Sequence, residues 1–215
     1  MATVEIDPLP DEWRSEQHDA FMRAVNLANC LATELDGVDL PASDRMRAVG
    51  AAWWVALEHH AGIVLLVRFG KLASAFALLR PEIDSYLRGL WLASSATDAE
   101  VSGFLSGDSA PGSEKLSHRL EAEGILDPDS LTAIQREMWC AVCDYTHTGC
   151  RQIVRHLTDS TVESAHDPEE IVELLSCANA WALMAAIGVA SAGQLDAKCE
   201  QLLELAKRIA DAGHG

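Results

Sequence analysis

The sequence predicts an all-α protein, a single domain over residues 1–215 in which about seven helices pack into a bundle. Alanine and leucine dominate a chain that is 49% hydrophobic, and β-branched residues do not cluster, a composition that favours helices over strands. Helix start and stop signals recur along the chain. With 215 residues and no break in composition, the chain is long enough to bury one core without disulfides.

Three long helices are expected in the first half of the chain. Asp11 can cap the first helix, and Gly37 can end it. Leu40-Pro41-Ala42-Ser43 begins the second. Pro81 lies within the third, where its missing N–H should kink the helix or mark a junction. The expected spans are 11–37, from 40–43 to about 70, and 71 to about 96.

More helices follow in the second half, separated by loops. Gly124 ends a short amphipathic helix. Asp127-Pro128 and Asp167-Pro168 are strong helix starts, because each combines a capping aspartate with proline at the first helical position. Glu170 is placed to complete a capping box with Asp167. The expected spans are a short turn after 98, then 113–123, 127 to about 149, 150–157, a helix from 167, and 195–212.

The stretch Leu174–Leu195 requires a test for membrane insertion, since it carries no charge and is long enough to span a bilayer. Much of it is alanine, serine, glycine, asparagine and glutamine. Leu174, Trp181, Gly188 and Leu195 recur every seven residues, which is typical of a buried helix with close contacts. We therefore expect a core helix and no membrane.

Charge and cysteine content restrict the partners and the compartment. The formal net charge is -17, with 33 acidic against 16 basic residues, and such a field repels phosphate backbones and anionic lipid. General DNA binding is therefore not expected, although a local basic site could still hold a small anion or RNA. Residues 1–13 contain no apolar signal core. We expect a cytoplasmic protein whose six cysteines are reduced.

Arg80, Asp84 and Arg88 form the first candidate site, a charged ladder on the apolar stripe of the third helix. At 100° per residue they lie on or beside the face that carries Phe76 and Trp91. Charges placed there are costly unless they pair. The ladder is either a structural ion pair or a binding site, because two arginines against one aspartate leave one guanidinium to hold an anion.

The second candidate site is residues 145–156, a basic segment with two arginines, two histidines and no acid. One interpretation is an ordinary helix junction with a capping histidine. The other is catalytic: Arg151 and His156 have the R-x4–6-H spacing of HEPN ribonucleases. In that case Arg151 would steady a phosphate, and His156 or His147 would move a proton. The spacing arises readily by chance, so its location after Gly149 is the argument for it.

Cysteines in the same region suggest metal or redox chemistry, which helix geometry disfavours. Cys140, Cys143, His147 and Cys150 read C-x2-C-x3-H-x2-C. On one helix they spread over roughly 15 Å, whereas zinc needs its ligands within about 2.3 Å of one point. A redox C-x-x-C belongs at a helix start after a strand, and this one lies within a helix. We expect no zinc, no other metal and no cofactor.

Residues 78–92 (LLRPEIDSYLRGLWL) and 144–157 (DYTHTGCRQIVRHL) resemble a bacterial family of helical proteins of unknown function. Its pattern is R-P-x-x-E-x-x-x-R-G-x-W followed by Y-T-H-x-G, and Asp84 stands where the family has glutamate. The family is loosely similar to HEPN-like and abortive-infection proteins. The resemblance implies a HEPN-like fold and a polar cluster, but no activity. Matching residues are Arg80, Pro81, Arg88, Gly89, Trp91, Tyr145, Thr146, His147 and Gly149.

Two function classes follow from these sites. In the first, Arg80, Asp84, Arg88 and Tyr145 form a buried binding cluster with His147 in a non-catalytic regulatory or defence-associated protein. In the second, His147, Arg151 and His156 are the catalytic residues of a metal-independent HEPN ribonuclease. A homodimer is expected, because the second helix is apolar on more than one face and needs a further partner; the alternative partner is another helix of the same chain. The apolar residues concerned are Trp53, Trp54, Ile63, Leu65, Leu66 and Phe69.

Overall fold

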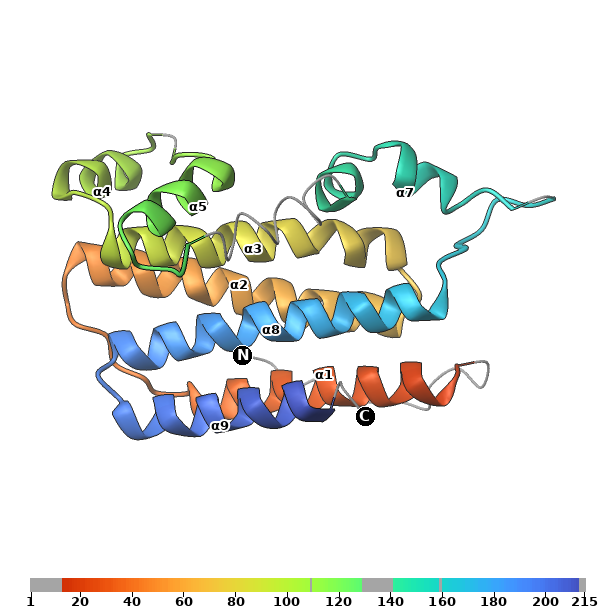
Figure 1. The fold of residues 1–215 in the computed structure, drawn as a ribbon, viewed down its shortest axis with the longest axis horizontal. Helices are drawn as coiled ribbons and strands as arrows, with labels where there is room; N and C mark the ends of the chain where they lie inside the picture. The colour runs from red at the N-terminus through yellow and green to blue at the C-terminus, as the bar shows by residue number, and fades with distance from the viewer. Residues whose placement is uncertain (1–12, 109, 129–140, 159, 213–215) are drawn as a thin grey trace.

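The computed structural model describes residues 13–108, 110–128, 141–158 and 160–212, and it confirms the all-α prediction (Figure 1). Residues 141–146 form an additional helical segment. The described residues contain more helical segments than the seven expected. The helices are α1 (Ser15–Glu34), α2 (Asp44–Arg68), α3 (Leu72–Ser94), α4 (Asp98–Leu105), α5 (Ser113–Ala122), α7 (Cys150–Val154), α8 (Pro168–Ala192) and α9 (Asp196–Ala212).

Helix α8 lies at the centre of the bundle, where it packs against α1, α2, α3 and α9. Helices α2 and α3 form an antiparallel hairpin, and Gly70 in its turn adopts a left-handed conformation with a φ of +64°. Helices α1 and α9 cover one side of this core, and α4, α5 and α7 lie on the outer side of α3 (Figure 1). This arrangement leaves α3 and α8 to frame the candidate site.

Several expected helix ends are found in the structure. The Ser43 hydroxyl accepts a hydrogen bond from the Met46 N–H, and the Glu170 carboxylate accepts one from the Asp167 N–H at 3.1 Å, so both helices begin where the capping residues predict. Gly37 and Gly124 follow α1 and α5 with positive φ angles. The expected cap Asp11 and most of the 127–149 helix lie outside the described residues.

Helices α2 and α8 are both long and apolar enough, by length and composition, to cross a membrane. Both run through the middle of the bundle, and their apolar side chains largely face other helices of the chain. The buried face of α8 includes small residues such as Ala178, Ala182 and Ala186, which allow close helix packing. Burial in the core therefore accounts for the uncharged stretch that required the test.

Trp53 occupies a slot between α3 and α8. Its side chain is buried, and its Nε1 donates to the Tyr86 carbonyl at 3.2 Å. A Cβ atom at Gly89 would lie 2.4 Å from Trp53 Nε1, and one at Gly188 would lie 2.8 Å from the same ring. The glycine of the R-G-x-W motif is thus needed for a close approach of an indole to the α3 backbone.

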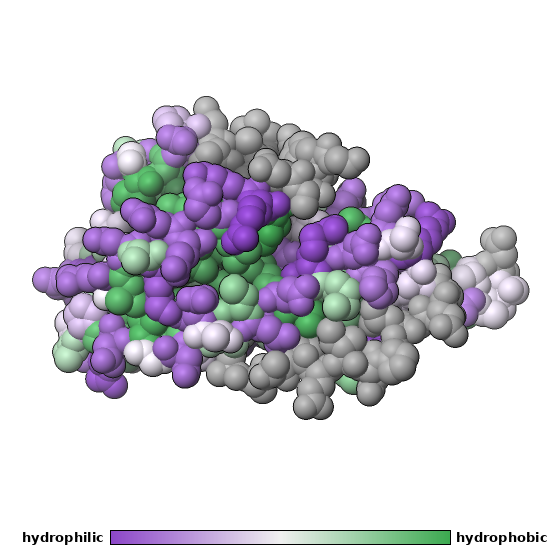
Figure 2. Space-filling model, turned by 90° about the horizontal axis from the view of Figure 1, so that it is seen from below, coloured by the Kyte–Doolittle hydropathy of each residue, from purple (hydrophilic) through white to green (hydrophobic). Residues whose placement is uncertain are grey.

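The apolar surplus of α2 is mostly used within the chain. Trp53 and Ile63 are buried, because α2 packs on α1, α3 and α8. Leu65 and Phe69 remain exposed near the end of α2. The face formed by α1 and α9 is mainly hydrophilic, with smaller hydrophobic areas between polar side chains (Figure 2). Other helices of the same chain therefore cover Trp53 and Ile63, but they leave Leu65 and Phe69 exposed.

A buried polar pair joins α2 to α8. His60, only 1% exposed, places Nε2 2.8 Å from the Asn179 Oδ1 atom. Its Nδ1 atom has no hydrogen-bond partner among the described residues. Burial, which penalises the imidazolium, lowers the pKa of His60 to about 4 from its ordinary 6.5, although the bond to Asn179 opposes this.

This pair predicts a loss of stability in mild acid. Below pH 6.5 the unfolded chain protonates His60 while the folded chain does not, so the free energy of unfolding should fall by roughly 3 kcal/mol as the pH drops to 4. Urea titrations of wild type and His60→Gln across this range should show the contribution as a difference that shrinks with falling pH. Exposed His18→Gln is the control, and a pH-independent difference for His60→Gln would contradict the prediction.

Candidate functional site

A partly buried cluster forms around Arg80 of α3, and we call it the Arg80 cluster. The Arg80 Nη1 atom donates to the Cys143 Sγ atom at 3.0 Å and lies 3.1 Å from the His147 Nε2 atom. Its Nε atom lies 3.8 Å from the Asp84 carboxylate, which also accepts a hydrogen bond from Ser113 of α5. The side chains of Arg80 and Asp84 are 24% and 16% exposed. The cluster is therefore only partly buried, whereas the sequence predicts a buried one.

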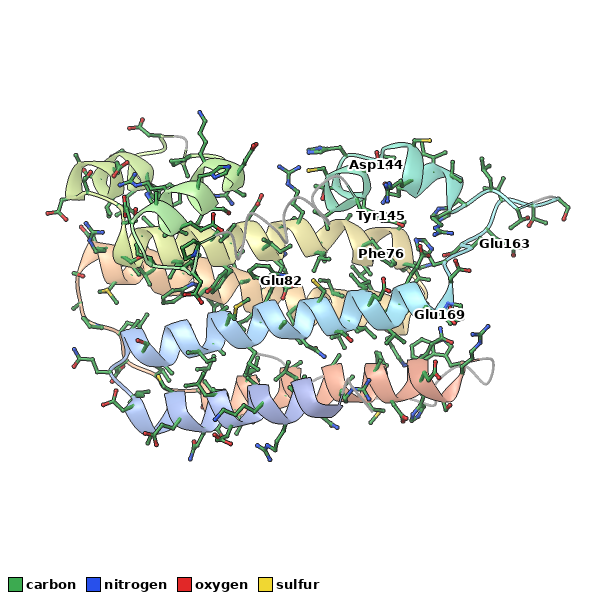
Figure 3. The ribbon with its side chains drawn as sticks, viewed as in Figure 1. Phe76, Glu82, Asp144, Tyr145, Glu163 and Glu169 are labelled. Atoms are coloured by element: carbon green, nitrogen blue, oxygen red, sulfur yellow. The ribbon has the colours of Figure 1, made fainter. Side chains whose placement is uncertain are left out.

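Tyr145 does not join this cluster, and that part of the prediction is wrong. Its ring stacks on Phe76, with centroids 4.7 Å apart, and lies close to His166 (Figure 3). Residues two apart on a helix point in nearly opposite directions, so Tyr145 and His147 cannot both face Arg80. Arg88 forms no ion pair within the described part of the chain, and Asp84 pairs with Arg80 instead.

Pro81 lies inside the single helix α3 (Leu72–Ser94), so it does not mark a junction between two helices. Proline has no N–H, so it cannot satisfy the carbonyl four residues earlier, that of Ala77. The Thr146 hydroxyl lies 3.3 Å from this carbonyl and 2.7 Å from that of Val142 in its own helix. The threonine of the second motif therefore offers a donor at the carbonyl that the proline of the first motif leaves unpaired.

This geometry predicts that Thr146→Val lowers the free energy of unfolding by about 1 kcal/mol, because the Ala77 carbonyl loses its donor. In a Pro81→Ala background the helix supplies its own N–H, so the same substitution should cost less. Chemical denaturation of the four proteins measures this coupling. Thr33→Val is the matched control, since the Thr33 hydroxyl donates to the Asn29 carbonyl in its own helix. Equal costs in both backgrounds would refute the link.

Asp144 positions α7 relative to the preceding segment. Its carboxylate accepts a hydrogen bond from the Arg151 N–H at the start of α7, which is where a negative charge favours a helix. Gly149 lies between Asp144 and Arg151 in the chain. A Cβ atom at Gly149 would lie 2.0 Å from the Asp144 Oδ1 atom. The glycine of the Y-T-H-x-G motif is thus required by close packing, and it precedes α7 instead of simply ending the earlier helix.

An open cavity lies between α3, the segment 141–146, α7 and α8, and we call it the α3–α8 cavity. Its volume is about 260 Å³. Most of its wall is apolar, with Phe76 and Leu79 from α3 and Leu174 from α8, and charged groups stand among these. Figure 3 shows Tyr145 above Phe76 on the side of α3 that faces this segment. The lining residues are Phe76, Leu79, Ala141, Val142, Tyr145, Arg151, Glu170, Glu173, Leu174 and Cys177.

A hydrogen-bonded network fixes one end of the cavity. Arg155 forms an ion pair with Glu170 and lies 3.5 Å from the Asp167 carboxylate, and it also hydrogen-bonds the Tyr145 side chain. Burial, the largest influence, raises the pKa of Tyr145, although Arg155 opposes this. His166 lies against Phe76 with ring centroids 4.9 Å apart. The network ties α8 to the segment 141–146 and holds the aromatic wall in place.

The three predicted catalytic residues do not meet in this cavity. Arg151 lines it, whereas His147 belongs to the Arg80 cluster. His156 directs Nδ1 to the Gln152 carbonyl at 3.0 Å, and its ring packs edge-on against His166. Arg151 belongs to α7, whereas His156 lies in the turn that follows its last residue, Val154, so the two side chains have different surroundings.

Comparison with known proteins identifies a family. The model of a family of unknown function, DUF6988, matches residues 53–213. The chain belongs to this family. The matched region contains α3, α7, α8 and α9 and both motif stretches, in agreement with the expected family of unknown function. No curated protein and no solved structure matches the chain.

Glu82 is the residue of this DUF6988 chain that sequence reasoning missed. It is completely buried between α3 and α8 (Figure 3), and neither carboxyl oxygen has a hydrogen-bond partner among the described residues. Burial raises the pKa of Glu82 well above its usual 4.5. Glu82 lies one turn from Leu79, and its charge contributes to the raised pKa of Cys177. Leu79 and Cys177 both line the cavity. The sequence pattern that could have predicted its burial is its position on the helix face that carries Leu79, Ile83 and Tyr86.

The cysteines do not form a metal site in the part of the DUF6988 chain that the structure describes, where no group of three potential ligands is close enough to hold an ion. Cys140, one of the four proposed zinc ligands, lies outside the described residues. Cys143 and His147 instead share the Arg80 guanidinium, and Cys150 is exposed.

Proposed function

We propose that this chain is a non-catalytic binding protein with a HEPN-like bundle, and that the α3–α8 cavity is its binding site for a small organic molecule. The observation that carries the proposal is the composition of this cavity. An apolar wall combined with a few fixed polar groups is typical of small-molecule sites, and 260 Å³ is close to the lower end of their usual volumes.

The chemistry of the lining favours binding over catalysis. Cys177 is the only thiol that lines the described cavity, and burial raises its pKa to about 11, so it remains a weakly nucleophilic thiol at neutral pH. The pKa of Tyr145 is also raised by burial, which keeps its hydroxyl protonated. Neither group is prepared for nucleophilic or general base catalysis near neutral pH.

The buried Glu82 carboxyl group provides a second line of support. An unpartnered buried polar group lowers stability, and such a group is kept more readily where function requires it. Glu82 lies one turn from Leu79 on α3, and its charge contributes to the raised pKa of Cys177; both of these neighbours line the cavity. A regulatory or defence-associated role, as the resemblance to abortive-infection proteins suggests, is consistent with a protein that binds a signal without transforming it.

A blocked cavity provides the test. Ligand-observed NMR with a collection of small organic fragments should find molecules that bind wild type and lose binding in Ala141→Trp, because the indole fills the cavity. Ala197→Trp places the same ring on the exposed surface of α9 and should leave binding unchanged. Circular dichroism checks that both variants fold. Absence of any fragment whose binding depends on Ala141 would reject the proposed site.

The alternative function is a metal-independent HEPN ribonuclease. The exposed Arg151 within the basic segment 145–156 favours it. Because Arg151 lines the α3–α8 cavity and His156 contacts Gln152 and His166 instead, such a site would need a second copy to complete it. A fluorescent single-stranded RNA in EDTA-containing buffer separates the functions. The binding proposal predicts no cleavage above background. Cleavage abolished by both Arg151→Ala and His156→Ala would instead establish the ribonuclease.

The homodimer remains a prediction, now supported by a different surface. Several exposed apolar side chains belong to α7 and to the segment between α7 and α8. They include Ile153, Leu157 and the 80% exposed Val162. Exposed apolar clusters often mark interfaces. Light scattering at micromolar concentration should give twice the mass of one chain, and Leu157→Asp should reduce it to one. Leu203→Asp on α9 is the control, and a single-chain mass for wild type would exclude the dimer.

A further inference from the structure

Two opposite charges of the α3–α8 cavity have no ion-pair partner among the residues that the structure describes. Arg151 from α7 and Glu173 from α8 both line it, yet neither side chain forms an ion pair with any described residue. The third charged group, Glu170, is already engaged by Arg155. The charges available to a bound molecule are therefore one cation and one anion, contributed by different helices.

An apolar wall lies in the same cavity as these charges. Phe76 and Leu79 come from α3 and Leu174 from α8, and Tyr145 extends the aromatic surface by stacking on Phe76. Burial against such a wall contributes free energy in proportion to the apolar area removed from water. A bound molecule that uses the whole cavity therefore combines a positive group, a negative group and an apolar body.

We propose that the α3–α8 cavity binds a small zwitterion with an apolar body, of the chemical class of a free amino acid with an aromatic side chain. The Arg151 guanidinium pairs with the carboxylate, the Glu173 carboxylate pairs with the ammonium group, and the side chain packs on Phe76 and Leu174. This inference rests on the proposed function, since it assigns the ligand of the same site. It adds that Arg151 binds the carboxylate end of the ligand and Glu173 binds the ammonium end.

The two ion pairs, one at each end of the ligand, should contribute separately to the binding affinity. A charge-assisted hydrogen bond is roughly twice as strong as a neutral one, and an arginine can bind a carboxylate through two parallel bonds. Loss of either pair should weaken binding about tenfold or more. Because Arg151 and Glu173 are exposed at the mouth, each regains water when its ligand partner is absent, so the loss stays moderate.

Three matched probes test the assignment: L-phenylalanine, phenethylamine, which lacks the carboxylate, and hydrocinnamate, which lacks the amine. Isothermal titration calorimetry on the full chain should show L-phenylalanine binding about tenfold more tightly than either analogue. Arg151→Gln should weaken L-phenylalanine and hydrocinnamate but leave phenethylamine unchanged. Glu173→Gln should weaken L-phenylalanine and phenethylamine but leave hydrocinnamate unchanged.

Surface substitutions of the same types provide controls. Arg47→Gln removes an exposed arginine from α2, and Glu200→Gln removes an exposed glutamate from α9. Both change the net charge as the test variants do, without touching the cavity, so they should not alter binding of any probe. An equal effect of these controls would mean that long-range charge, and not contact, governs affinity.

The outcomes separate this inference from the proposed function. The crossed pattern of losses supports the zwitterion. If an analogue with one charge binds as tightly as L-phenylalanine, or if the losses do not follow the ligand group removed, the zwitterion assignment is overturned while the cavity remains a binding site. If no probe binds and no fragment depends on Ala141, the proposed function fails together with the inference.

Discussion

Replacing Gly89 with alanine should lower the free energy of unfolding by about 2 kcal/mol or more, although alanine favours a helix over glycine by about 1 kcal/mol. The new methyl group would lie 2.4 Å from the Trp53 ring. The ring cannot retreat, because Gly188 holds the α8 backbone equally close on its other side. Urea denaturation of wild type and variant at neutral pH measures the loss.

Two comparisons isolate the slot around Trp53. Gly62→Ala is the matched control, because a Cβ atom there would meet only the flexible end of Leu78 at 3.1 Å, and the substitution should be nearly neutral. In a Trp53→Phe background the smaller ring leaves room, so Gly89→Ala should cost less than it does in wild type. Similar stabilities for Gly89→Ala and Gly62→Ala would contradict the tight packing.

Replacing Glu82 with glutamine should stabilise the protein increasingly as the pH rises above 4.5. Burial raises the pKa of Glu82 in the folded chain, so above 4.5 the unfolded chain loses this proton first. Stability then falls with rising pH by up to about 1.4 kcal/mol per pH unit until the folded group also ionises. Glutamine has no such titration, so its advantage over wild type should grow with pH until Glu82 ionises in the folded chain.

Chemical denaturation at several pH values measures this difference. Glu58→Gln removes an exposed carboxylate from α2 and should show no comparable growth with pH. A difference between Glu82→Gln and wild type that stays constant across the range would mean that Glu82 is ionised and stabilised in the folded protein. That result would also remove the second line of support for the proposed function.

Much of the fold could be predicted from local sequence, because its signals act within a few residues. Ser43 and Asp167 cap helices whether or not the rest of the chain is known, and the helical composition excludes a β fold. The behaviour of Pro81 could not be predicted in the same way. Whether a proline interrupts a helix depends on what reaches the carbonyl it leaves unpaired, and Thr146 comes from a distant segment.

The candidate site was predictable only in part, for a related reason. Arg80 and Asp84 are neighbours on one helix, so their pairing follows from spacing. The partner His147 followed from the second motif, but Tyr145 was assigned to the same cluster although it lies on the opposite side of its helix. The cavity itself arises where α3, α7 and α8 meet, and no short-range pattern encodes such a meeting.

The most direct test of the central claim, that the α3–α8 cavity is the binding site, is a titration of the ¹⁵N-labelled chain with L-phenylalanine followed by amide chemical shifts. We expect saturable shifts that are largest at cavity residues such as Arg151, Leu174 and Cys177, with little change at exposed positions of α9. Shifts concentrated on α1 and α9, or no saturable shift at millimolar L-phenylalanine and with every fragment, would contradict it.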